Sequence, residues 1–190
     1  MDEEPGAKRQ IELYLTHFTL ASLATLLLVA PILPAFSSQY AVVYSAKWDG
    51  RPEKVAVKVL KKEHCGSQGP ILDMQAETQI LSKLQNNPGI VNIFASGETI
   101  DGRPFFIMEK LSGTTLGPCI KNIIDYRKRL DMAISLARIF ESLHKGAATE
   151  GKKVLHRDLK PANVGVTPQT GQLRLLDFGL VRLLHYDEER

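Results

Sequence analysis

Two short stretches near the end of the chain contain polar side chains whose types and spacing fit a chemical role. The first reads HRDLKPAN over residues 156–163, and the second reads LLDFG over residues 175–179. Asp158 supplies a carboxylate that could orient a hydroxyl group and take its proton. Asn163 and Asp177 supply oxygen ligands of the kind that hold Mg²⁺ against phosphates. This combination of residue types is typical of phosphoryl transfer.

A lysine far upstream could supply the positive charge that this chemistry needs. Lys58 ends the stretch VAVK, which alternates like a strand, so its ammonium could reach the α- and β-phosphates of a nucleotide. A long, flexible side chain needs a fixed partner to hold it in place. We expect Glu77, on the helix that follows, to pair with Lys58.

The sequence around these residues predicts the strands that must position them. YAVVYSAKW at residues 40–48 and KVAVKVL at residues 54–60 read as two strands joined by a DG turn at residues 49–50. A second hairpin follows, in which GIVNIFASGE and RPFFIMEKL flank a DG turn at residues 101–102.

Two stretches predict helices. MQAETQILSKLQ at residues 74–85 spaces its apolar residues along one helical face, and RLDMAISLARIFESLHK at residues 129–145 carries a broad apolar face. The loop that holds Asp158 and Asn163 follows the second helix, and Asp177 follows the strand-like QLRLL. The sequence shows no internal repeat.

The set of motifs resembles the eukaryotic-type protein kinases of the serine/threonine type. VAVK, the glutamate of AETQILSKL, FFIMEKL, HRDLKPAN and DFG occur in the family order from about Tyr40 onwards. The resemblance implies an α+β fold with two lobes. One is a small antiparallel sheet lobe with one helix, and the other is part of a helical lobe. We expect a hydrophobic N-terminal segment at residues 1–36, the sheet lobe at 37–111 and the partial helical lobe at 112–190.

The resemblance also implies a role for each polar motif residue. Asp158 would be the catalytic base, and Lys160 would steady the transferring phosphoryl group. A lysine at this position resembles the serine/threonine-directed form of the loop. Asn163 and Asp177 would hold Mg²⁺, and Lys58 would bind the phosphates of ATP. The expected cofactors are therefore ATP and Mg²⁺, and the expected partner is a protein substrate.

Other motif positions would form the rest of the nucleotide site. The resemblance implies that Met108 stands at the gatekeeper position, and that Glu109 and Leu111 offer backbone groups to adenine. Val43 and Ala56 would cover the adenine ring. A hydrophobic column linking the two lobes would consist of Leu81, Ile93, His156 and Phe178.

The glycine-rich phosphate loop of the family is absent from this sequence. Phe36, Ser38 and Ala41 stand at the three positions where the family carries glycine, which lets backbone amides approach the phosphates closely. The strand that should lie just upstream falls in a region with Pro31 and Pro34, and proline removes a hydrogen-bond donor from a sheet. We therefore expect a weaker grip on the phosphates.

Two further departures concern the base site and the substrate surface. Gly165 stands where the family usually has a large apolar residue that supports adenine from below, so we expect a thin floor for the base. The sequence ends at Arg190, before an APE motif and the helices that build the rest of the large lobe. We expect the substrate-binding surface to be largely absent.

The N-terminal segment is apolar, and three interpretations of it stay open. Residues 13–46 contain no Asp, Glu, Lys or Arg, and FTLASLATLLLVAPIL at residues 18–33 approaches the length of a membrane span. Leu and Ala favour helix, so we expect a helix over residues 14–33. It could anchor the chain in a membrane with the kinase-like part in the cytosol, lie across the sheet lobe of a cytoplasmic protein, or be foreign to the domain.

Composition and charge narrow the functional classes. The 190 residues are 44% hydrophobic and 24% charged, which is typical of a globular protein. The 24 basic and 21 acidic residues are scattered without the basic stripe of a nucleic-acid surface, so we expect no nucleic-acid partner. Cys65 and Cys119 lack metal-ligand spacing and suit reduced thiols in a cytosolic compartment.

Two functional hypotheses follow. The first is an ATP- and magnesium-dependent protein serine/threonine kinase with an incomplete domain, which the intact Lys58, Asp158, Asn163 and Asp177 favour. The second is a non-catalytic binding or scaffold protein with a degenerate kinase fold, which the missing glycines and the early end favour. Because transfer depends on close positioning of the reactants, we expect the chain as written to transfer phosphate poorly or not at all.

Overall fold

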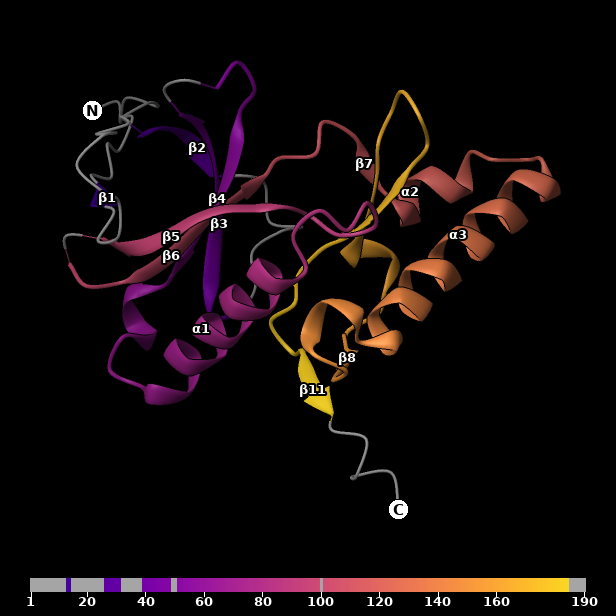
Figure 1. The fold of residues 1–190 in the computed structure, drawn as a ribbon. Helices are drawn as coiled ribbons and strands as arrows, with labels where there is room; N and C mark the ends of the chain where they lie inside the picture. Colours follow the sequence, from indigo (N-terminus) through magenta and orange to yellow (C-terminus); the bar gives the residue numbers. More distant parts are fainter. Residues whose placement is uncertain (1–12, 15–25, 32–38, 49–50, 100, 185–190) are drawn as a thin grey trace, which may run out of the picture. The chain divides into compact units, whose positions relative to one another are not determined.

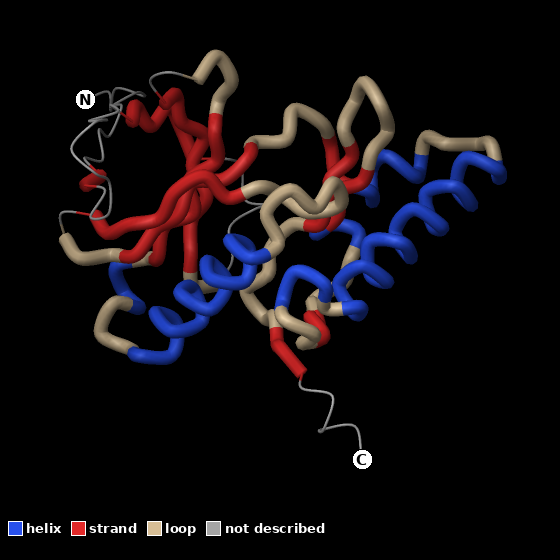
Figure 2. Tube along the Cα trace, in the orientation of Figure 1, coloured by secondary structure: helices blue, strands red, loops and turns tan. Residues whose placement is uncertain are grey.

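The computed structural model describes residues 13–14, 26–31, 39–48, 51–99 and 101–184. The chain divides into two compact units, which Figure 1 and Figure 2 show as one part rich in strands and one rich in helix. The sheet unit comprises residues 1–74 and 94–110, and the helix unit comprises residues 75–93 and 111–190.

The sheet unit is built on a six-stranded sheet with the order β1-β5-β6-β4-β3-β2. Its strands are β1 (Leu13–Tyr14), β2 (Leu26–Pro31), β3 (Ala41–Trp48), β4 (Val55–Leu60), β5 (Ile93–Thr99) and β6 (Pro104–Glu109). A short 3₁₀ turn, η2 (Lys62–His64), and helix α1 (Gln68–Lys83) follow β4. The two predicted hairpins and the first predicted helix are therefore confirmed, with boundaries that differ by a few residues.

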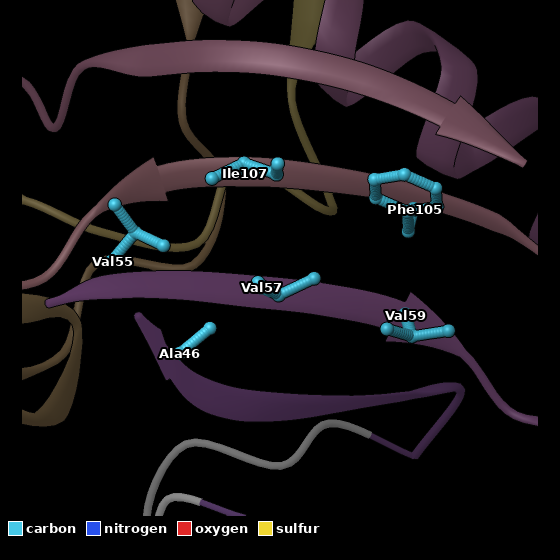
Figure 3. Packing of buried hydrophobic residues seen from close by; sticks show 6 residues of the cluster. All are labelled: Ala46, Val55, Val57, Val59, Phe105 and Ile107. Atoms are coloured by element: carbon cyan, nitrogen blue, oxygen red, sulfur yellow. The ribbon is translucent and has the colours of Figure 1, made fainter. Parts of the chain in front are cut away.

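The core of the sheet unit consists of aliphatic and aromatic side chains from the central strands. All six residues of β4 are buried, because this strand lies between β3 and β6 in the sheet. Ala46 of β3 and Phe105 and Ile107 of β6 pack with three valines of β4 (Figure 3). The β-branched side chains suit the pleated surface of a strand that is covered on both faces.

The hairpin between β5 and β6 has the glycine that its turn requires. Gly102 has a φ of 74°, in the left-handed region that favours glycine, and its amide donates to the Thr99 carbonyl at 2.9 Å. The Asp101 carboxylate accepts from the Thr99 hydroxyl at 2.6 Å and from Arg103 Nε at 2.9 Å. The DG dipeptide therefore forms the predicted turn.

The expected helix over residues 14–33 is wrong where the structure describes this segment. Residues 26–31 form strand β2, which pairs antiparallel with β3 and continues to Pro31 opposite Tyr44. Proline is tolerated there because β2 lies at the edge of the sheet. The remaining residues between 15 and 33 lie outside the described part. Across the described residues, no helix combines the length and the apolar character that crossing a bilayer requires.

The helix unit contains the end of α1, two further α-helices, short 3₁₀ turns and two small sheets. Its elements are β7 (Thr114–Thr115), α2 (Leu116–Lys121), α3 (Tyr126–Lys145), η3 (Ala147–Thr149), β8 (Lys153–Leu155), η4 (Pro161–Asn163), β9 (Val164–Val166), β10 (Leu173–Leu175) and β11 (Arg182–Leu184). The sheets have the orders β10-β9-β7 and β11-β8. The expected α+β class is confirmed.

Helix α3 begins and ends at residues with sequence-encoded caps. The Asp125 carboxylate accepts from the Arg127 amide at 2.9 Å, and Gly146 ends the helix with a φ of 66°. Its predicted apolar face is only partly covered, since Leu143 is buried whereas Leu130 and Ile134 are 46% and 42% exposed.

Candidate active site

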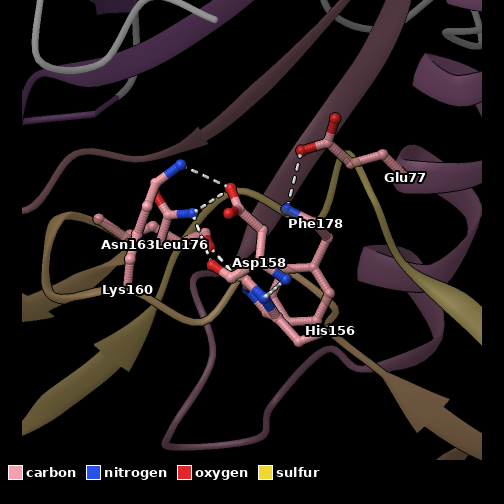
Figure 4. Close-up of polar contacts among 7 residues, drawn as sticks. All are labelled: Glu77, His156, Asp158, Lys160, Asn163, Leu176 and Phe178. Atoms are coloured by element: carbon pink, nitrogen blue, oxygen red, sulfur yellow. Dashed lines mark hydrogen bonds and ion pairs between the residues drawn. The ribbon is translucent and has the colours of Figure 1, made fainter.

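The catalytic-loop motif folds into a compact network around the Asp158 carboxylate. Lys160 Nζ lies 2.7 Å from Asp158 Oδ2, and Asn163 Nδ2 donates to the same oxygen at 2.8 Å (Figure 4). Asn163 Nδ2 also donates to the Asp158 backbone carbonyl at 2.9 Å. The 3₁₀ turn η4 makes this possible, because it returns the chain so that Asn163 faces the residue five positions earlier. The structure therefore brings three of the predicted residues together.

Lys160 is charged over the whole physiological pH range. Its hydrogen bond to Asp158 raises the pKa of the Lys160 ammonium, and the negative charges of Asp158 and Asp177 act in the same direction. The Lys160 side chain is about half exposed, at 52%, so solvent screens this interaction. Lys160 can therefore present a permanent positive charge beside the carboxylate.

His156 is a buried, neutral group that supports the loop. The Asp158 amide donates to His156 Nδ1 at 3.3 Å, so the proton of the neutral ring belongs on Nε2, which lies 2.9 Å from the Leu176 carbonyl. Burial lowers the pKa of His156, against opposing effects of the Leu176 carbonyl and the nearby carboxylates. The neutral imidazole thus joins the Asp158 loop to Leu176, the residue before Asp177.

The DFG motif is fixed by contacts to α1 and to His156. The Phe178 amide donates to Glu77 Oε1 at 3.2 Å, and the Phe178 ring meets the His156 ring edge-on at 4.8 Å between centroids. Both Glu77 and Phe178 are buried. Of the four residues predicted for a hydrophobic column, Leu81 and Ile93 are likewise buried, and contact between His156 and Phe178 is observed.

Two site residues have backbone angles that side-chain-bearing residues adopt infrequently. Arg157 has a φ of 64° and Asp177 a φ of 56°, both in the left-handed region. Such conformations cost free energy and persist when the surroundings fix them. Here the neighbours of both residues are held by hydrogen bonds, since Asp158 is tied to Asn163 and Phe178 to Glu77.

The chemistry of the donor set fits a hard divalent cation. Asn163 uses its amide nitrogen toward Asp158, which leaves the amide oxygen Oδ1 as a ligand of the type that Mg²⁺ accepts. Asp177 adds carboxylate oxygens, and its segment is connected to that of Asn163 because the Leu176 amide donates to the Asn163 carbonyl at 2.9 Å. The residues present are therefore suited to hold Mg²⁺.

The predicted residues of the sheet unit lie on three adjacent strands. Val43 of β3 stands opposite Lys58 of β4, and Ala56 of β4 stands opposite Met108 of β6. Lys58 is 6% exposed, and its ammonium lies 5.7 Å from the centre of the Phe106 ring. Lys58 and Glu77 belong to different units, so their pairing stays a prediction.

Two expected features of the nucleotide site depend on glycine positions. Phe36 and Ser38 lie outside the described residues, and Ala41 is the buried first residue of β3. At Gly165, the Leu111 side chain fills the space where a side chain of residue 165 would lie, and the expected thin floor for the base stays a prediction. Sequence reasoning missed this contact. The signal for it was a glycine inside the apolar strand VGV, which indicates a close approach by another group.

Comparison with known proteins finds protein kinases, both in a family model and among individual relatives. A family model described as a protein kinase domain matches residues 37–190. A probable serine/threonine-protein kinase of Clostridium perfringens, CPE1738, is 31% identical over 142 residues, which cover 74% of this chain and 19% of that protein. The serine/threonine-protein kinase PknA of Mycobacterium tuberculosis is 33% identical over 135 residues, covering 68% of this chain and 30% of that protein.

A third relative extends the same pattern. The serine/threonine-protein kinase PknK of Mycobacterium tuberculosis is 30% identical over 146 residues, which cover 76% of this chain and 12% of that protein. The chain thus spans less than a third of the length of each of these relatives.

Proposed function

Since the chain belongs to the protein kinase family, we propose that it transfers the γ-phosphoryl group of ATP to serine or threonine hydroxyl groups of a protein substrate. The observation that carries the proposal is the fixed Asp158 carboxylate, with Lys160 and Asn163 both bound to its Oδ2. This arrangement orients a proton acceptor beside a permanent positive charge, which is what transfer to a hydroxyl group requires.

Asp158 acts as the base in this proposal. The substrate hydroxyl oxygen forms a bond to the γ-phosphorus, the bond from that phosphorus to the bridging oxygen of ATP breaks, and Asp158 takes the hydroxyl proton. ADP leaves with the electron pair of the broken bond. Lys160 stabilises the negative charge on the transferring group. Because two donors hold Asp158 Oδ2, the carboxylate is oriented before the substrate arrives.

Asn163 and Asp177 would hold Mg²⁺ through their side-chain oxygens. Bound Mg²⁺ neutralises charge on the phosphate oxygens. In this chain, the hydrogen bonds of Asn163 to Asp158 connect the cation-binding amide to the base. The bond from the Phe178 amide to Glu77 fixes the residue after Asp177. Contacts within the helix unit thus hold Asn163 and the residue that follows Asp177.

Lys58 would bind the α- and β-phosphates, with Glu77 as its proposed partner. Val43 and Ala56 would cover the adenine ring, and Met108 would stand at the back of the base site. The register of β3, β4 and β6 supports this assignment, because Val43 is opposite Lys58 and Ala56 is opposite Met108. Glu109, the last residue of β6, and Leu111 would offer backbone groups to the base.

The test is Mg²⁺-dependent transfer from labelled ATP to a generic basic protein, with phosphoserine and phosphothreonine located by mass spectrometry. We expect slow but measurable transfer by the wild-type chain, because Phe36, Ser38 and Ala41 replace the glycines of the phosphate loop. Asp158→Asn should lower the rate by about 100-fold or more. Chelation of Mg²⁺ should abolish transfer.

Asp131→Asn provides the matched control, because Asp131 is exposed on α3 and the substitution is the same. It should leave the rate unchanged. If the wild-type chain binds ATP but shows no transfer that depends on Asp158, the proposal fails and a non-catalytic binding role replaces it.

A further inference from the structure

At Gly165, a side chain would meet the Leu111 side chain in its observed conformation. Gly165 is the buried central residue of β9, and its neighbours in the sheet are Arg174 of β10 and Thr115 of β7. A Cβ atom at this position would collide with Leu111 Cδ1 and would lie 3.6 Å from Leu176 Cδ1. The Leu111 side chain therefore lies directly over the backbone of Gly165.

Together these residues form an apolar surface, which we call the leucine platform and which consists of Leu111, Gly165 and Leu176. Leu111 and Leu176 are both half-buried, so each residue stays partly accessible to solvent. Because Gly165 has no side chain, nothing from this residue lies between the Leu111 and Leu176 side chains. An accessible apolar surface of this kind suits the face of a flat, aromatic ring.

The leucine platform adjoins the residues proposed to hold Mg²⁺ and phosphate. Gly165 follows Asn163 by two positions, and Leu176 immediately precedes Asp177. The Leu176 amide donates to the Asn163 carbonyl at 2.9 Å, so the two segments are held together at this point. A nucleotide whose phosphates engage Asn163 and Asp177 would carry its base close to the platform.

We propose that the Leu111 side chain supplies the helix unit's apolar support for the adenine base, in place of the missing side chain at residue 165. This inference rests on the proposed use of ATP. It gives Leu111 a second role, because the resemblance to the kinase family assigned it only a backbone contact. Leu111 thereby determines the affinity for the base, whereas the phosphates are bound by other residues.

Binding measurements on three variants test the inference, with ATP and inorganic tripolyphosphate as the two probes. Leu111→Ala should weaken ATP binding about tenfold, as expected for the loss of apolar contact from one leucine side chain. Its affinity for tripolyphosphate, which lacks a base, should not change. Gly165→Leu alone should weaken ATP binding and lower the melting temperature, because the new side chain collides with Leu111.

The double variant Leu111→Ala with Gly165→Leu is the decisive protein. It places a leucine at residue 165 of β9 and removes the side chain of Leu111 that would meet it. ATP affinity should therefore recover to within about threefold of the wild-type value. Leu130→Ala is the control, because Leu130 is 46% exposed on α3 and lies outside the proposed site. It should bind both probes like the wild-type protein. A melting curve on each variant establishes that it is folded.

The outcomes separate the inference from the proposed function. Wild-type ATP affinity in folded Leu111→Ala, an equal loss of ATP and tripolyphosphate binding, or no recovery in the double variant would overturn the inference alone. If the wild-type chain binds no adenine nucleotide, both the inference and the proposed function fail. If Gly165→Leu does not fold, Leu111→Ala and the double variant still decide the matter.

Discussion

The two units position their candidate functional residues by different means. In the sheet unit, Lys58 and Ala56 are held by the register of paired strands around an apolar core. In the helix unit, Asp158 is held by side-chain hydrogen bonds on an irregular backbone. The first arrangement depends on how well apolar groups pack, whereas the second depends on a few polar atoms. The two units should therefore respond differently to substitution.

Removal of a large core side chain from the sheet unit should have the largest effect on stability. Phe105 is 2% exposed and packs in the cluster of Figure 3. Phe105→Ala should lower the free energy of unfolding by about 3–5 kcal/mol, because it removes apolar contacts and leaves a cavity. Urea unfolding measures this change. Leu72→Ala, at a position that is 60% exposed on α1, should change stability by less than about 0.5 kcal/mol.

Asn163 provides the corresponding test in the helix unit. Asn163→Ala removes both hydrogen bonds to Asp158 and should cost about 1–3 kcal/mol in unfolding free energy. Asn122→Ala is the control, because Asn122 is exposed and makes one long bond of 3.3 Å to the Pro118 carbonyl. A cost for Asn163→Ala as large as that of Phe105→Ala would contradict the difference between the two units.

The left-handed backbone at Arg157 allows a finer test of the same idea. Arg157→Gly relieves the steric cost of a φ of 64°, whereas Arg157→Val adds a β-branched side chain that tolerates this conformation poorly. We expect the glycine variant to be more stable than the valine variant by about 1–2 kcal/mol in urea unfolding. Equal stabilities would mean that this loop does not hold its observed conformation in solution.

The neutral state of His156 predicts the smallest effect, a dependence of stability on pH. Burial lowers the pKa of His156 below its usual 6.5 in the folded state. Between the lowered pKa of the folded state and the usual 6.5 of the unfolded chain, the unfolded chain binds more protons than the folded one. The contribution of neutral His156 to stability is therefore complete above about pH 6.5 and declines as the pH falls.

Melting temperatures of the wild-type protein and His156→Gln, measured from pH 7.5 down to pH 5, should show the difference. The wild-type protein should lose more stability over this range, because glutamine does not titrate. The other histidines contribute equally to both proteins. Parallel curves would show that His156 is not a neutral, buried group.

Much of the fold followed from periodicity, and much of the site from motif spacing. Alternation in AVVYSAKW and VAVKVL predicted β3 and β4, and the apolar spacing of residues 129–145 predicted α3. The helix expected over residues 14–33 failed at β2, because pairing with β3 overrides the helix preference of leucine and alanine. The composition of residues 14–33 does not reveal that the edge of β3 is available for pairing with this segment.

The details of the site were harder to predict for physical reasons. The left-handed angles of Arg157 and Asp177 depend on contacts that are distant in sequence, and these residue types do not demand such angles. The bond from the Phe178 amide to Glu77 joins residues 101 positions apart. The motifs predicted which residues would be important, but periodicity contains no information on which backbone atoms they bind.

The contact between Leu111 and Gly165 also constrains the order in which substitutions can accumulate during evolution. A larger residue at 165 would meet Leu111 Cδ1, so it requires either a shift of the Leu111 side chain or a smaller residue at 111. If the change at 165 comes first, the intermediate depends on that shift. A lineage that carries this pair therefore meets the least steric conflict when residue 111 becomes smaller first, and on the proposal above that intermediate would bind its nucleotide more weakly.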